Sequence, residues 1–133
     1  MRQKPALTSS DAHTMMAACK AEAAKNKWKV AIAIVDDSGA ALLLERLDGT
    51  GSIASDVAMG KAKTAALTGR PSKFFEDRVK ERPAFVTYPT PGVMFQGGLP
   101  IVHQGECVGA IGVSGVQSHE DEQIAQAGIS ALG

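Results

Sequence analysis

Apolar residues recur at two different spacings along the first half of the chain. A helix is predicted to begin after Thr8, whose hydroxyl can cap it, and to run to about Lys25. The continuous apolar run 30–35 is typical of a buried strand. The turn sequence 36–39 and a further apolar stretch, 41–47, follow it, so the pattern predicts a hairpin at this point.

Helical spacing returns in the middle of the chain. Apolar or small residues recur there at intervals of three or four, namely Ile53, Val57, Gly60, Thr64 and Leu67. Gly69 and Pro71 supply a C-terminal glycine and a proline stop, so this helix is expected to end at the glycine. Ser72 is predicted to cap a second, shorter helix, which Pro83 ends.

The last third predicts a loop, a second hairpin and a closing helix. Residues 82–96 hold three prolines, too many for a regular element. Two apolar runs, 99–102 and 107–114, flank a polar turn, and helical spacing then covers about 119–132. This order of elements predicts an α+β fold in which helices cover a single, mainly antiparallel sheet.

Composition narrows the domain count and the function classes. The chain has 133 residues, 44% of them hydrophobic, which predicts one domain, 1–133, with one core. Fourteen basic residues balance fourteen acidic ones, so no excess positive charge favours nucleic acid or an anionic membrane surface. No apolar run is as long as a signal-peptide core or a membrane span, which indicates a cytoplasmic protein. Cys19 and Cys107 lack CxxC spacing and are expected to be reduced thiols.

Glycines lie beside and inside the apolar runs of the last third, in the segments 96–102 and 108–115. Such glycines indicate that another backbone, or a ligand, comes closer than a side chain would permit. Four other segments belong to the same pattern, namely 35–39, 45–49, 60–66 and 120–125. Together, the six segments resemble the GlcG/HbpS family of small haem-associated proteins, which includes the C-terminal domain of PduO.

The resemblance runs in order from about Leu7 to Leu132. It implies a PAS- or profilin-like sheet surrounded by helices, assembly into symmetric homo-oligomers, and haem as the associated cofactor. It assigns no axial haem ligand, because no local motif in this sequence matches one.

Two basic residues are candidates for binding a ligand carboxylate or a haem propionate. Lys61 lies one residue from the apolar stripe of its helix, where its ammonium could reach a pocket mouth, and the family match at 60–62 favours that role. A surface lysine with a buried stem is the alternative. Arg70 has a restricted backbone before Pro71, and its guanidinium suits a carboxylate, with a structural salt bridge as the alternative.

Aromatic residues supply candidate walls for a flat ligand. Phe85, Tyr88 and Phe95 cluster around the predicted loop, although only 5% of the chain is aromatic. The adjacent pair Gly97 and Gly98 is a candidate for close backbone approach to that ligand.

A second candidate region is the strand-to-helix junction at Ser114 and Gly115. Free amides at a helix start attract anions, which favours ligand binding there. The carboxylates of Glu120 and Asp121 in the first helical turn offset the positive field of the helix start. Capping the helix and binding a ligand are therefore both possible roles for these two residues.

Histidines are the first candidates for haem ligands, since neutral imidazole binds iron. His13 and His119 are candidates, as is His103, but no two of them have ligand spacing, and a solvated or capping role is the alternative for each. Tyr88 and Met94 are weaker axial candidates, and no metal site is assigned.

Three function classes follow. The first is a small-ligand-binding domain associated with haem or another tetrapyrrole, as the resemblance implies. The second is a cofactor-free lyase or isomerase acting on a small aromatic carboxylate such as hydroxylaminobenzoate, as the resemblance implies for some relatives. Its candidate acids and bases are Glu106, Glu120, Asp121 and Tyr88. The third is an oligomeric scaffold or sensor whose apolar faces form subunit contacts.

Overall fold

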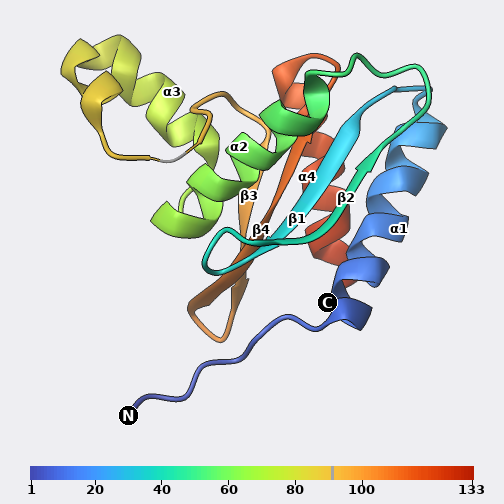
Figure 1. The fold of residues 1–133 in the computed structure, drawn as a ribbon, viewed down its shortest axis with the longest axis horizontal. Coiled ribbons are helices and arrows are strands. Elements are labelled where there is room, and N and C mark those ends of the chain that lie inside the picture. The colour runs from blue at the N-terminus through green and yellow to red at the C-terminus, as the bar shows by residue number, and fades with distance from the viewer. Residues whose placement is uncertain (91) are drawn as a thin grey trace.

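A computed structural model describes residues 1–90 and 92–133. Its centre is one four-stranded sheet in the order β2-β1-β4-β3, in which every pairing is antiparallel (Figure 1). The strands are β1 (Ala31–Asp36), β2 (Ala41–Arg46), β3 (Gly98–His103) and β4 (Glu106–Ser114). The helices are α1 (Ser9–Lys25), α2 (Ala54–Thr68), α3 (Ser72–Glu81) and α4 (Ser118–Ala131), with a short 3-10 helix η1 at Pro83–Thr87. The predicted α+β class is confirmed.

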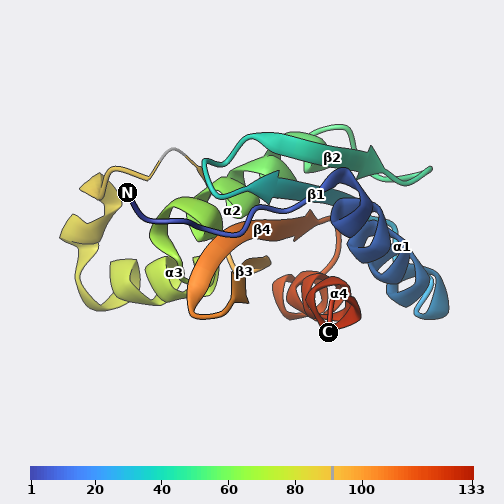
Figure 2. The same cartoon turned by 90° about the horizontal axis from the view of Figure 1, so that it is seen from below.

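Helices cover both faces of the sheet, and this explains the unbroken apolar run of β1. Figure 2 shows α1 and α4 on one side of the sheet and α2 on the other. Ile32 and Ile34 belong to the core cluster under α1 and α4, whereas Ala31, Ala33 and Val35 pack with the alanines of α2. Because successive side chains of a strand point to opposite faces, a strand covered on both faces is apolar at every position.

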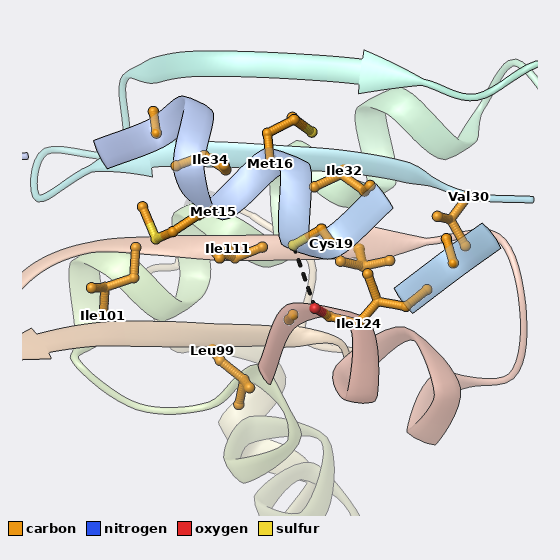
Figure 3. Packing of buried hydrophobic residues seen from close by; sticks show 14 of the residues in the cluster. Met15, Met16, Cys19, Val30, Ile32, Ile34, Leu99, Ile101, Ile111 and Ile124 are labelled. Atoms are coloured by element: carbon orange, nitrogen blue, oxygen red, sulfur yellow. Dashed lines mark hydrogen bonds between the residues drawn. The ribbon is translucent and has the colours of Figure 1, made fainter. Parts of the chain in front are cut away.

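The α1 and α4 side holds the larger apolar side chains (Figure 3). Met15 and Cys19 from α1 meet Ile111 from β4 and Ile124 from α4, and all four are fully buried. The Cys19 thiol donates a hydrogen bond to the Ile124 carbonyl at 3.4 Å, and burial raises the pKa of Cys19 to about 12. Cys19 and Cys107 are both free thiols, as expected.

Small residues let α2 approach the other face of the sheet very closely. A Cβ at Gly112 of β4 would lie 2.6 Å from the Ala62 nitrogen and would clash with the Ala58 carbonyl. Glycine is therefore required by the contact between the α2 backbone and the strand. This close approach carries Lys61, on the same helix, into the interior.

The predicted helix ends are confirmed in two cases. Thr8 and Asp11 form a reciprocal capping box at the start of α1. Gly69 closes α2 in the left-handed conformation, with φ of 68°. In the second hairpin, Gln104 and Gly105 form the turn, and both have positive φ, as a tight two-residue hairpin turn requires.

The prediction that Ser72 caps α3 is wrong. Pro71 is the N-cap residue and Ser72 lies inside the helix, fully buried. Its hydroxyl donates to the Phe95 carbonyl and accepts from the Gly98 amide at 2.9 Å, so it ties α3 to the segment that enters β3. The predicted loop also contains η1; Pro91, one of its three prolines, lies outside the described residues.

Candidate functional site

Lys61 and Asp121 form an ion pair inside the protein. Lys61 projects from α2 and Asp121 from the first turn of α4, and each side chain is only 3% exposed. The Lys61 ammonium donates to Asp121 Oδ2 at 3.1 Å and to the Val113 carbonyl at 2.9 Å. Lys61 does bind a carboxylate, but that carboxylate belongs to the chain itself, so an incoming ligand would have to displace Asp121.

The second oxygen of Asp121 is also occupied. The Val116 amide donates to Asp121 Oδ1 at 3.2 Å, so this carboxylate stabilises the turn between β4 and α4. Burial raises the pKa of Asp121, and the nearby Lys61 charge opposes that rise. Asp121 accepts from the amide just before the N-cap Gln117, which is close to the capping role predicted for it, and its ligand-binding role stays a prediction.

The predicted glycines surround this pair. A Cβ at Gly97 would lie 2.8 Å from both Lys61 Nζ and the Val113 carbonyl oxygen, and one at Gly98 would lie 2.8 Å from the Lys61 carbonyl carbon. At the junction after β4, a Cβ at Gly115 would lie 2.9 Å from the Val30 Cα. The close approach expected at these glycines is therefore made by the protein's own backbone and by Lys61.

The other candidate acids and bases lie on separate parts of the fold. Glu106 begins β4 and pairs with Arg2 at the surface. Glu120 completes a capping box by accepting from the Gln117 amide at 3.2 Å. Tyr88 follows η1 and is 45% exposed. Three cavities of the described residues, at the two ends of α1 and beside η1, are each lined by at most one of the four catalytic candidates.

Aromatic residues do cluster, on α3 and η1. Tyr88 lies between Phe75 and Phe85, with ring centroids 5.1 Å and 5.8 Å away. The Arg70 guanidinium lies 4.4 Å from the Phe74 ring centroid, and no ion pair joins it to any residue in the described ranges. Phe95 is 57% exposed, outside this stack.

A partly enclosed cavity lies away from these aromatic residues, between the two ends of the chain. Its volume is about 300 Å³, and it opens between the N-terminal segment, the β3–β4 hairpin and the end of α4. Apolar side chains form most of its wall, namely Leu7, Ile101, Val102, Val108, Ile129 and Leu132. His103 and Asp11 supply the polar groups. We call this the His103 cavity.

The two polar groups of the His103 cavity interact electrostatically. Hydrogen bonds from the backbone and side chain of Thr8 are the main cause that lowers the pKa of Asp11, and attraction to His103 adds to it. The sequence pattern offered His103 as one of three candidate histidines but could not reveal the cavity, because its lining comes from three segments far apart in the chain.

The other two histidines are placed differently. The His13 ring is exposed on α1, with Nδ1 2.8 Å from the Ser9 carbonyl oxygen, and His119 is exposed in the first turn of α4. Neither lines the His103 cavity. In the ranges 1–90 and 92–133, no three His, Cys, Asp or Glu side chains gather as a metal site would need, and no helix is long and apolar enough to span a bilayer.

One antiparallel sheet covered by helices on both faces, with a cavity between the two ends of the chain, defines a small α+β domain. Residues 7–130 match the family model for the haem-degrading-protein HbpS-like family. The chain belongs to this HbpS-like family.

Similar proteins agree with that assignment. Protein GlcG from Escherichia coli is 43% identical over 115 residues, which cover 86% of this chain and 85% of GlcG. The crystal structure of a double mutant of HbpS from Streptomyces reticuli has a TM-score of 0.91 at 34% identity, covering 100% of this chain and 91% of that one. A crystal structure of a PduOC:haem complex has a TM-score of 0.87 at 27% identity, covering 96% and 95%.

Proposed function

We propose that the protein binds haem, or a related tetrapyrrole, at the His103 cavity. The observation that carries the proposal is a cavity whose wall combines apolar side chains with an exposed imidazole. The family is described by haem degradation, and a similar structure is a haem complex, which supports this ligand class. Apolar walls with few polar groups are typical of sites for flat organic cofactors.

The residues present fit the edge of a macrocycle. Leu7, Ile101 and Leu132 offer apolar contact to the ring, and His103 is the one imidazole in the wall. Asp11 also lines this cavity, and its carboxylate attracts His103 electrostatically. Haem, when bound, would supply the iron and its redox chemistry; the chain supplies the walls and the imidazole.

At this cavity we propose other cations for the propionates than the predicted Lys61 and Arg70, because Arg70 lies against the Phe74 ring and does not line it. Lys61 is engaged inside the protein, whereas Arg2 and Lys4 lie in the N-terminal segment that enters the cavity wall at Pro5. Both are exposed and pair only with surface carboxylates, Arg2 with Glu106 and Lys4 with Asp37 at 3.1 Å. Such exposed pairs are weak and exchange partners readily.

The cavity is small for a whole macrocycle. Its volume of about 300 Å³ is at the lower end of the range for ligand sites, and it is open to solvent. We therefore propose that a second copy of the chain covers the outer face of the ring, so that haem binding and homo-oligomer formation are coupled.

A haemin titration followed by the Soret band tests this proposal. The wild-type protein is expected to show a saturable shift, His103→Ala a changed Soret position and weaker binding, and the matched variant His119→Ala no change. Light scattering during the titration is expected to show a rise in mass. Absence of a saturable shift, or identical titrations for wild type and His103→Ala, would reject this site.

The lyase alternative has less support. Its four candidate groups are spread over the described fold, two of them in capping roles, and the pair of Lys61 and Asp121 is closed to solvent. Ammonia release from hydroxylaminobenzoate by the purified protein is the direct assay for that activity.

A further inference from the structure

A second concavity lies at the other end of α1 from the His103 cavity. Helix α1 has 17 residues and so spans roughly 25 Å, with the His103 cavity beside its start. The second concavity, of about 510 Å³, lies beside its end. Its lining is formed by Lys20, Ala23, Ala24, Lys27, Trp28, Lys29 and Leu47. We call it the lysine pocket.

Lys27 occupies a strained backbone position in this pocket. The Lys27 amide donates to the Ala24 carbonyl at 3.1 Å and the Trp28 amide to the Ala23 carbonyl at 2.9 Å, which is the bond pattern of a Schellman helix end. Lys27 has φ of 59°, in the left-handed region where glycine is favoured. Helix stability therefore does not explain a lysine at this position.

Two lysine charges in the pocket are not neutralised by neighbouring carboxylates. Lys20 pairs with Glu45 at 2.9 Å, but no ion pair joins Lys27 or Lys29 to any residue of 1–90 or 92–133. The last carbonyls of α1 do not need them, because backbone amides and the Asn26 side chain already bond there.

Lys29 and Trp28 also line the lysine pocket, Lys29 with a charged group and Trp28 with an apolar ring. A Cβ at Gly49 would lie 2.8 Å from Lys29 Cδ, so the turn after β2 is shaped to hold this side chain. Trp28 is half-buried, and Ala23 and Leu47 add apolar surface beside it. Lys27 and Lys29 line the same concavity as the Trp28 ring, and this combination is complementary to an anion that carries a flat apolar group.

We propose that the lysine pocket binds a flat organic carboxylate, with Lys27 and Lys29 holding the carboxylate and Trp28 contacting the ring. This site is separate from the His103 cavity, and the inference does not rest on the haem proposal. The charge of the ligand is expected to be required, because Lys27 and Lys29 supply the charged groups of a wall that is otherwise mostly apolar.

Trp28 gives the experiment a specific probe, because it is the only tryptophan in the chain. Naphthoate is titrated into nitrogen-15-labelled protein while the indole N–H cross-peak of Trp28 is followed. A saturable shift of this cross-peak is expected with naphthoate. The neutral naphthalenemethanol is expected to bind at least about tenfold more weakly, because it lacks one charge-assisted contact.

Two variants separate binding from folding. Lys27→Gly together with Lys29→Met is expected to weaken naphthoate binding about tenfold or more while the unfolding midpoint does not fall, since glycine relieves the strain at position 27. Lys25→Met, in the last turn of α1 but outside the pocket, is the matched control and is expected to bind as wild type. His103→Ala is also expected to bind naphthoate normally, which keeps this test independent of the haem proposal.

The proposal is overturned by any of three results. These are equal binding of the alcohol and the carboxylate, unchanged binding in the double variant, and a shift that stays linear to about 10 mM, since that is weaker than a specific site requires.

Discussion

The Lys61 ammonium and the Asp121 carboxylate lie 3.1 Å apart in a part of the protein from which water is almost excluded. Each group is needed by the other, because a lone buried charge is far more costly than a buried pair. The pair joins α2 to the first turn of α4, and the Val113 carbonyl adds the end of β4. Three elements that are distant in the sequence are thereby held at one point.

Removing one partner of this pair should destabilise the protein strongly. Lys61→Met leaves the Asp121 carboxylate buried without its counter-charge, and we expect a loss of about 3–5 kcal/mol in the free energy of unfolding, measured with urea. The double variant Lys61→Met/Asp121→Leu should recover much of that loss, since it leaves no unpaired charge. Equal destabilisation in the single and double variants would contradict this account.

The close contact between α2 and β4 predicts a second stability effect. Gly112→Ala places a methyl group against the Ala58 carbonyl and the Ala62 nitrogen, neither of which can move without shifting the helix. We expect a loss of at least about 2 kcal/mol, in the range of overpacked cores. Gly51→Ala is the matched control, because a Cβ there meets nothing within 4 Å, and it should change the free energy of unfolding by less than about 0.5 kcal/mol.

Ser72 should contribute to stability through its hydrogen bonds and not as a helix cap. Ser72→Ala leaves the buried Gly98 amide without its acceptor, for an expected loss of about 1–3 kcal/mol. The exposed Ser52→Ala serves as control and should be near neutral. Amide hydrogen exchange offers the local readout: Gly98 should exchange faster in Ser72→Ala, and unchanged protection there would argue against the role.

The Asp36 turn should make stability fall at acid pH. Asp36 Oδ1 accepts from the Ser38 hydroxyl at 2.6 Å and from the Ser38 and Ala40 amides, and these bonds, that of the Ser38 hydroxyl first, lower the pKa of Asp36. A lowered pKa means that the unfolded chain binds the proton more readily, so this stabilisation is full above about pH 4 and is lost as pH falls below it.

Asp36→Asn tests that dependence. At pH 7 the variant should lose about 1 kcal/mol of unfolding free energy, as for weakened hydrogen bonds in a turn. The difference from wild type should shrink as the pH is lowered from 4 to 2. A difference that is constant with pH would show that ionisation of Asp36 is not involved.

Local signals predicted the elements well. The cap at Thr8 and the left-handed end at Gly69 depend only on residues a few positions away, and both are confirmed. The unbroken apolar run of β1 correctly indicated a strand, and its position between helices on both faces came from the structure. Ser72 was misread because a serine after proline has the same local pattern whether it caps the helix or bonds to a distant segment.

The candidate site was predictable only in part. The Gly97 and Gly98 pair correctly indicated close approach, and the neighbour that the structure shows there is Lys61 of the same chain. The sequence position of Lys61, one residue from the apolar stripe, could not show whether its ammonium reaches solvent or a buried carboxylate 60 residues away.

By itself, the sequence determined the order and type of the elements, the α+β class and the family, because periodicity, turn chemistry and family motifs are properties of neighbouring residues. Only the tertiary structure decided which groups meet. The burial of Lys61 against Asp121 and the meeting of His103 with both ends of the chain depend on how the helices pack on the sheet. Those contacts are set by packing between segments far apart in sequence, which no local pattern records.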